Sequence, residues 1–226
     1  MIPLRDWLSE KPYALAMSAG YFGFFAHAGL LSVLEEQGLT PSSVSGASAG
    51  ALIAGLWASG LSCKRIEEEL FRQKLHSLLQ ADTFETARVP VQISVFDLFR
   101  RKTEVLRSGN LCDAIAASCA LPVLFHPVVV NSRMCIDGGV LDRPALCGVP
   151  QDVRVLYHHL ASKSPWRRYV PVPQKRESMV SIAISNMPRV NPFHLERGQF
   201  AFFHARNQIK YALNQLVPET GAELTI

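Results

Sequence analysis

Two long stretches without a charged residue limit what this chain can fold into. Residues 12–34 and 37–63 contain no Lys, Arg, Asp or Glu, and each is longer than the roughly 20 residues that cross a membrane as a helix. Turn-forming residues interrupt both stretches, namely Ser18–Ala19–Gly20 and Gly23 in the first and Pro41–Ser42–Ser43 in the second. Because a lipid-facing helix has to be continuous, the stretches predict the buried core of an α/β domain rather than membrane spans.

The composition predicts one folded domain. The 226 residues are 48% hydrophobic and 19% charged, which is too apolar for a disordered chain and sufficient for one sizeable core. We therefore expect a single domain over residues 1–226. The net charge of +4 and the pI near 8.9 are too mild for a dedicated nucleic-acid-binding protein, while a negatively charged surface stays open as a partner.

Cysteine usage and the N-terminal segment predict a cytoplasmic protein. The five cysteines form no Cys-x-x-Cys pair, which favours neither a disulfide framework nor a zinc site. Residues 1–11 carry charges with no apolar region before them, unlike a secretory signal. The sequence contains no Walker motif, no Gly-x-Gly-x-x-Gly fingerprint and no metal-ligand spacing, so we expect no metal and no cofactor.

Hydrophobic periodicity predicts strands and helices that alternate along the chain. Strands are expected at residues 13–17, 43–45, 90–96, 103–106, 128–130, 133–136, 153–157 and 179–184. Helices are expected around residues 28–36, at 48–59, 65–79 and 111–119, and within 193–216. This alternation predicts an α/β fold in which helices cover the faces of a central sheet.

The segment Gly46–Ala47–Ser48–Ala49–Gly50 matches the motif Gly-x-Ser-x-Gly. It lies where a predicted strand turns into a helix, which is the setting in which this motif presents a nucleophile. The glycines allow strand and helix to pass closely while the Ser48 hydroxyl projects from the sheet edge. The helix start adds free N–H groups, and that of Ala49 is placed to bond an oxyanion. A helix start rich in small residues, without chemistry, is the alternative interpretation of the motif alone.

A serine nucleophile needs a base, because its hydroxyl is barely ionised at neutral pH. None of the histidines stands in a recognisable triad context, namely His27, His76, His126, His158, His159, His194 and His204. Asp137 is followed by Gly138–Gly139 after an apolar strand, which puts a carboxylate on a tight turn that other backbone can approach. The same pattern is typical of an ordinary turn, so the motif alone leaves catalysis by Asp137 open.

Four motifs, taken together and in order, resemble the patatin-like phospholipase family. They are Ser18–Gly29, Gly46–Leu52, Ala117–Pro122 and Asp137–Asp142. The resemblance covers about residues 13–144 and implies a three-layer α/β fold with a mostly parallel central sheet. It also implies a serine acyl hydrolase of lipid degradation, which cleaves phospholipid or lysophospholipid esters through a Ser48–Asp137 dyad and a covalent acyl-enzyme.

The resemblance further implies that backbone N–H groups at Gly20, Tyr21 and Ala49 form the oxyanion hole. This loop departs from the family pattern, because Gly23 stands where a basic residue is usual and Tyr21 where glycine is usual. Arg143 also replaces a frequent Asn. These departures keep two alternatives open: a catalytically silent lipid- or acyl-binding protein, and an acyltransferase in which another acceptor replaces water.

A basic segment at residues 163–176 raises the question of whether the protein binds a membrane surface. It carries five basic residues and no acid, interleaved with Trp166 and Tyr169, and such a loop can dock on anionic lipid headgroups. A solvated connecting loop is the simpler interpretation, because no amphipathic anchor helix accompanies it. We therefore expect a lipid or acyl-ester substrate and no nucleic acid, with peripheral contact to an anionic membrane as the open alternative.

Overall fold

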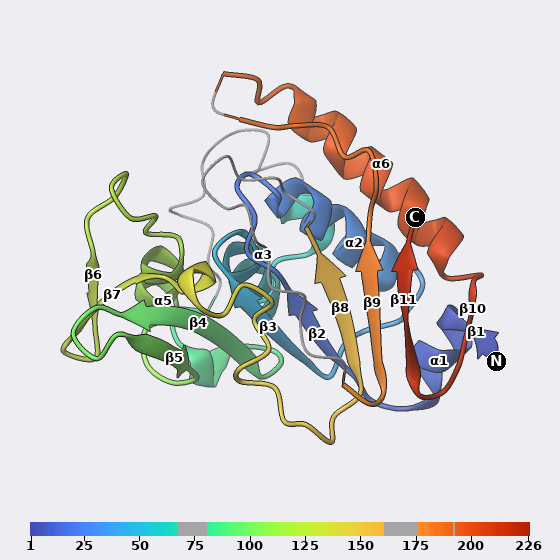
Figure 1. The fold of residues 1–226 in the computed structure, drawn as a ribbon, viewed down its shortest axis with the longest axis horizontal. Coiled ribbons are helices and arrows are strands. Elements are labelled where there is room, and N and C mark those ends of the chain that lie inside the picture. The colour runs from blue at the N-terminus through green and yellow to red at the C-terminus, as the bar shows by residue number, and fades with distance from the viewer. Residues whose placement is uncertain (67–80, 161–175, 192) are drawn as a thin grey trace.

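The computed structural model describes residues 1–66, 81–160, 176–191 and 193–226. Within these ranges a nine-stranded sheet has the order β11-β9-β8-β2-β3-β4-β7-β6, with β5 paired to β4 (Figure 1). Its strands are β2 (Ala14–Met17), β3 (Ser43–Ala47), β4 (Val91–Asp97), β5 (Lys102–Leu106), β6 (Val128–Val130), β7 (Arg133–Asp137), β8 (Val155–His159), β9 (Met179–Ala183) and β11 (Gly221–Thr225).

The sheet is mostly parallel. Strands β11, β9, β8, β2, β3 and β4 pair in parallel, whereas β5, β7 and β6 join in antiparallel pairs. Met17 at the end of β2 lies opposite Gly46 near the end of β3. Because the carboxyl ends of parallel strands meet at one edge, the loops after β2 and β3 lie together where α/β proteins place their sites.

Helices cover one face of this sheet. They are α2 (Phe24–Glu36), α3 (Ala49–Ala58), α5 (Leu111–Ser118) and α6 (Arg197–Ala212), and α6 packs along α2 (Figure 1). Leu15 and Met17 of β2 belong to the large core that includes these helices. Ala14 and Ala16 point the other way, into a smaller cluster with Val149. A central, mostly parallel sheet with helices packed against it confirms the predicted α/β class.

The two uncharged stretches supply the centre of this core, as expected. The first contains β2 and all of α2 except Glu35 and Glu36, and the second contains β3 and α3. All four elements are almost entirely buried. None of the helices described is both long and apolar enough to cross a membrane.

The predicted strands and helices are confirmed within one or two residues at most ends. Asn131 and Ser132 form the hairpin turn between β6 and β7, with φ of 49° and 61°. Two positive φ angles in a row give the turn a twist that matches the right-handed twist of the flanking strands. Gly38 and Gly60 follow the ends of α2 and α3 and have φ of 69° and 112°, the left-handed angles that commonly end a helix. Most of the predicted helix 65–79 and of the basic segment 163–176 lies outside the described residues.

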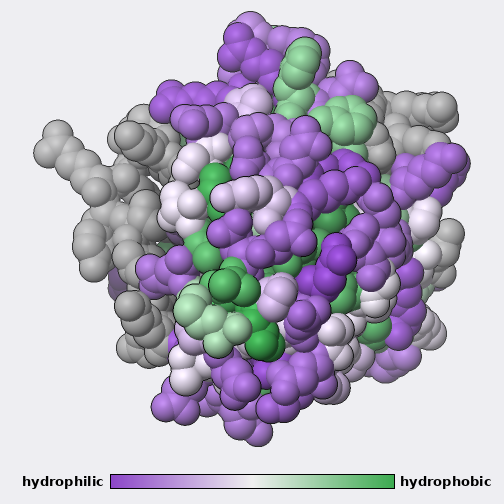
Figure 2. Space-filling model, turned by 90° about the vertical axis from the view of Figure 1, so that its right-hand side faces the viewer, coloured by the Kyte–Doolittle hydropathy of each residue, from purple (hydrophilic) through white to green (hydrophobic). Residues whose placement is uncertain are grey.

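Several short elements, most of them near the termini, escaped prediction. They are β1 (Ile2–Pro3), α1 (Leu4–Glu10), β10 (Leu216–Val217), the edge strand β11 and the 3-10 turns η2 (Phe84–Thr86) and η3 (Gly138–Val140). Strands β1 and β10 pair, which ties the two ends of the chain together on one side of the molecule (Figure 1). Figure 2 shows that this side, where β11 forms the sheet edge, is mostly hydrophilic. Glu223 is exposed on β11, and a charge on an edge strand discourages pairing with other chains.

Candidate active site

A small pocket brings most of the predicted site residues together. Its volume is about 180 Å³, and its lining consists of Ala19, Gly20, Tyr21, Ser48, Leu121, Pro122, Asp137, Gly139, Val140 and Arg143. The candidate nucleophile and the candidate base therefore belong to one pocket, although they are far apart in the sequence. Ala49 is buried next to Ser48 and is not part of the lining.

The backbone of Ser48 is strained. Ser48 joins β3 to α3 at φ 53° and ψ −118°, a conformation that costs a residue with a side chain about 1–3 kcal/mol. A Cβ at Gly46 would overlap the backbone of Gly50, and a Cβ at Gly50 would overlap the carbonyl of Met17. The two glycines thus permit the close approach of β2, β3 and α3 that forces this sharp turn.

Hydrogen bonds from the end of α5 hold the backbone of Ser48. Its N–H donates to Ser118 Oγ at 2.9 Å, and that hydroxyl donates to the carbonyl of Ser94 at 2.7 Å. The Ser48 carbonyl accepts from Leu52 N–H at 3.1 Å and from Cys119 Sγ at 3.3 Å. Burial, and then the negative charge of Asp137, raise the pKa of the Cys119 thiol to about 12. Cys119 therefore stays protonated and donates its S–H.

Asp137 ends β7 and is only 3% exposed. Its Oδ1 accepts from the Gly139 N–H at 2.7 Å, and its own N–H donates to the Ala120 carbonyl at 3.0 Å. A Cβ at Gly138 would overlap the carbonyl of Ser94, so the aspartate turn lies directly against β4. These contacts hold the Asp137 carboxylate in one orientation at the pocket wall.

The loop between β2 and α2 is held by contacts outside itself. Ala19 N–H donates to the Arg143 carbonyl at 2.7 Å, and the Arg143 guanidinium donates to the Leu160 carbonyl at 2.9 Å. A Cβ at Gly20 would lie 2.6 Å from Leu160 Cδ1. Arg143, which replaces the family's frequent Asn, thus braces the loop against the end of β8.

The predicted oxyanion donors lie on this loop and at the start of α3. Tyr21 keeps an ordinary negative φ, and the unusual backbone angle falls on Phe22 at φ 53°. The N–H groups of Gly20, Tyr21 and Ala49 donate to no acceptor among the described residues. Gly20 and Tyr21 line the pocket, whereas Ala49 directly follows the lining residue Ser48 in the sequence.

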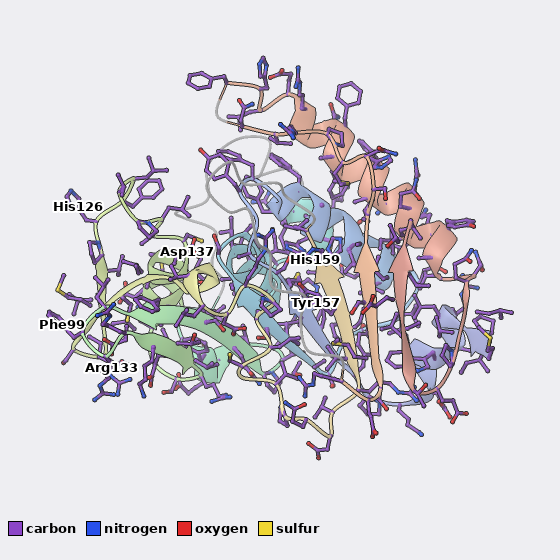
Figure 3. The ribbon with its side chains drawn as sticks, viewed as in Figure 1. Phe99, His126, Arg133, Asp137, Tyr157 and His159 are labelled. Atoms are coloured by element: carbon purple, nitrogen blue, oxygen red, sulfur yellow. The ribbon has the colours of Figure 1, made fainter. Side chains whose placement is uncertain are left out.

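No histidine in the described ranges lines the pocket. Figure 3 shows Asp137 between His126, which lies near β6, and His159 at the end of β8. His76 is outside the described residues. The same ranges contain no group of three or more His, Cys, Asp or Glu side chains suited to a metal ion.

Two histidines instead form a buried pair beneath the loop. Their Nδ1 atoms are 2.8 Å apart, and His27 Nε2 lies 2.9 Å from the Ser18 carbonyl. Because a carbonyl only accepts, the neutral His27 carries its proton on Nε2, and its Nδ1 accepts from Nδ1–H of His158. Burial lowers the pKa of His27 to about 4, a trend that nearby His159 reinforces and the Ser18 contact opposes, and burial also lowers that of His158. Both rings are neutral at pH 7.

Sequence reasoning missed the contacts of Ser118, Arg143 and the histidine pair. Each joins segments at least 17 positions apart along the chain. Ser118 stands in one of the four family-like motifs, which marks it as a residue of interest but does not reveal its partner. Only the folded arrangement of α5, β3 and β4 identifies it.

The family model described as patatin-like phospholipase matches residues 15–82 and 68–146, more than half of the chain. The chain belongs to this family. The patatin-like match ends shortly after the Asp137–Asp142 motif, so it includes both candidate catalytic residues. The family comparison thus agrees with the motifs seen in the sequence.

Curated relatives extend the comparison. Three proteins named uncharacterized NTE family proteins, one from Mycobacterium bovis and two from Mycobacterium tuberculosis, are 26% identical over 175 residues, which cover 65% of this chain and 49% of each relative. The chain therefore spans about half the length of these curated relatives.

Solved structures support the fold. VipD from Legionella pneumophila superposes with a TM-score of 0.60 at 14% identity, over 89% of this chain and 66% of VipD. ExoU from Pseudomonas aeruginosa has a TM-score of 0.51 at 14% identity, over 90% of this chain and 53% of ExoU. At this identity the likeness concerns the architecture alone, and it agrees with the predicted α/β class.

Proposed function

We propose that this patatin-like chain is a serine acyl hydrolase that cleaves acyl esters of lipids through a covalent acyl-enzyme. The observation that carries the proposal is that a strained Ser48 and a buried Asp137 both line one pocket. Family membership supports lipid esters as the substrate class. Phospholipids and lysophospholipids are the expected members of that class.

In the first half-reaction, Ser48 Oγ attacks the ester carbonyl carbon while the Asp137 carboxylate takes the hydroxyl proton. The resulting oxyanion is stabilised by the free N–H groups of Gly20, Tyr21 and Ala49, and each such donor is worth on the order of 10²-fold in rate. The tetrahedral intermediate then collapses, the C–O bond to the alcohol breaks, and Asp137 returns its proton to the leaving alcohol. Ser48 is left as an acyl ester.

In the second half-reaction, water attacks the acyl carbon and Asp137 removes a proton from that water. Collapse of the second intermediate releases the carboxylic acid and returns the proton to Ser48 Oγ. Asp137 acts directly, because no histidine in the described part of the chain lines the pocket. A single carboxylate therefore serves as base and acid in both halves.

Exposed apolar side chains next to the pocket support a lipid substrate. Tyr21 lines the pocket and is 53% exposed, while Val123, Leu124 and Leu141 are at least 60% exposed and follow lining residues in the sequence. Contiguous exposed apolar surface is typical of interaction sites. Such a rim suits an acyl ester presented by a lipid aggregate, and the same proposal includes peripheral contact with an anionic membrane from the cytoplasmic side.

Labelling with a fluorophosphonate, followed by mass mapping of the modified residue, tests the proposal. We expect one label per chain on Ser48, and hydrolysis of a short-chain nitrophenyl ester that Ser48→Ala abolishes in a folded protein. Asp137→Asn is expected to lower turnover by a similar factor. Lipid binding without labelling or turnover would instead identify a silent binding protein. Faster product release on adding alcohol or lysolipid, with transfer of the acyl group, would identify an acyltransferase.

A further inference from the structure

The end of α5 contacts both halves of the candidate dyad. Ser118 Oγ accepts from the Ser48 N–H at 2.9 Å, and Cys119 Sγ donates to the Ser48 carbonyl at 3.3 Å. One residue further, the Ala120 carbonyl accepts from the Asp137 N–H at 3.0 Å. Three consecutive residues therefore bind the backbone of the nucleophile on one side and that of the carboxylate on the other.

Among these three residues, Ser118 holds Ser48 most firmly, because its side chain is inaccessible to water and its hydroxyl both accepts and donates a hydrogen bond. Its exposure is 0%, it accepts from the Ser48 N–H, and it donates to the Ser94 carbonyl at 2.7 Å. Without this hydroxyl, the Ser48 N–H would lose its partner and the Ser94 carbonyl one of its contacts, and leaving a polar group unsatisfied costs more than the bond contributes when present.

The position of Ser48 gives this contact a consequence for chemistry. Ser48 is held at φ 53° and ψ −118°, and such angles persist only where the surroundings determine them. Its N–H points to Ser118, which orients the peptide plane that leads into Ser48. A change in that plane moves the attacking Oγ relative to the pocket.

We propose that Ser118 is a positioning residue for the nucleophile. It locks the Ser48 backbone against β4 while the next two residues tie the same segment to Asp137, so that hydroxyl and carboxylate keep a fixed separation. The effect on catalysis rests on the proposed function, whereas the effect on the Ser48 backbone does not.

A matched control is available in Ser45 on β3. Ser45 is 1% exposed and donates its hydroxyl to the Ala145 carbonyl at 2.6 Å, so Ser45→Ala also removes a buried hydroxyl from the core of the sheet. It does not line the pocket, and its hydroxyl bonds to neither Ser48 nor Asp137. Any effect of general destabilisation is shared by the two variants.

The experiment compares wild type, Ser118→Ala and Ser45→Ala by steady-state ester hydrolysis and by the rate of fluorophosphonate labelling. For Ser118→Ala we expect kcat and the labelling rate to fall on the order of 10²-fold with KM within about 3-fold, as for a misplaced reacting group. Ser45→Ala is expected to keep both rates within about 3-fold of wild type. Equal rates in the two variants would overturn the proposal.

A second measurement keeps this inference separate from the proposed function. Hydrogen exchange of the Ser48 amide is expected to accelerate about 10-fold in Ser118→Ala, relative to Ser45→Ala, because its acceptor is gone. Unchanged hydrogen exchange would overturn the positioning role of Ser118, whether or not the protein is active. A wild-type protein that is inactive and not labelled would reject only the proposed hydrolase function. If Ser118→Ala fails to fold, Ser118→Cys keeps a weaker acceptor and donor, and its exchange and kcat are expected to lie between those of wild type and a full loss.

Discussion

The buried pair of His27 and His158 makes a quantitative prediction about acid stability. Both side chains are 0% exposed. Neutral rings satisfy the contact with the Ser18 carbonyl and the Nδ1–Nδ1 contact. An added proton would go to Nε2 of His158, and this atom has no hydrogen-bond acceptor among the described residues. The native state therefore binds that proton much more weakly than the unfolded chain does.

The sign and size follow from the pKa of His27, which burial lowers from 6.5 to about 4. Between these two pH values the unfolded chain binds more protons than the native state, so the free energy of unfolding rises with pH and levels off above 6.5. Each pH unit is worth about 1.4 kcal/mol for one proton, which gives about 3 kcal/mol from His27. His158 shifts in the same direction and adds to this figure.

Urea unfolding at a series of pH values tests this, with wild type compared with the double variant His27→Gln/His158→Gln. The glutamine amides offer one donor and one acceptor each but do not titrate. Between pH 7 and pH 4, the free energy of unfolding of wild type should fall by at least about 3 kcal/mol more than that of the double variant. His126→Gln, at an exposed site, is the control and should follow wild type. Parallel profiles for wild type and the double variant would refute a pair locked in its neutral form.

Three further predictions concern the packing around the site. Gly50→Ala should lower the free energy of unfolding by about 2 kcal/mol or more, because its Cβ would overlap the carbonyl at the end of β2. In Gly148→Ala the new Cβ would meet only side chains, so urea unfolding should show a smaller loss for this control. Asn110→Ala removes the side-chain cap of α5 and should cost about 1 kcal/mol in the same assay. Iodoacetamide at pH 8 should modify exposed Cys112 well before Cys119, as mass mapping would show.

Local patterns predicted most of the fold because the core elements alternate between apolar and turn-forming residues on short length scales. The strand before Ser18 and the glycine-flanked Ser48 were recognisable for this reason. Strand β11 was missed, although Ala222 and Leu224 alternate with the more polar Gly221, Glu223 and Thr225, because its place at the sheet edge comes from parallel pairing with β9, which its own short sequence does not show. Helix α1 is short, and its position depends on the burial of Trp7 in the main core.

The site was predictable in part for the same reason. Ser48 and Asp137 lie in motifs that are legible within five residues, and the structure brings both to one pocket. Residues that act through partners leave no local signal, because nothing near Ser118 in the sequence shows that its hydroxyl accepts from a residue 70 positions away. Arg143 is similar: the sequence shows the substitution, and the fold shows what the guanidinium contacts.

Asp142 provides a final prediction, because three donors converge on its buried carboxylate. Oδ2 accepts from Ser94 Oγ at 2.6 Å and from Cys147 N–H at 3.2 Å, and Oδ1 accepts from Leu146 N–H at 3.0 Å. An amide has one acceptor oxygen, so in Asp142→Asn its NH2 group would face at least one donor. We expect the free energy of unfolding to fall by about 2 kcal/mol in urea, whereas Asp152→Asn at an exposed turn should change it little.

The kinetic consequence of Asp142→Asn should be smaller than that of Ser118→Ala. Both changes reach Ser94, but Asp142 bonds to its hydroxyl and Ser118 to its carbonyl. That carbonyl belongs to β4, whose backbone is held by pairing with β3, β5 and β7, so losing the side-chain contact should leave it in place. Ester hydrolysis by Asp142→Asn at a temperature where the protein is folded should therefore keep kcat within about 10-fold of wild type. A loss as large as that of Ser118→Ala would show that the Ser94 carbonyl moves with its side chain, and that the fixed point for Ser48 lies elsewhere.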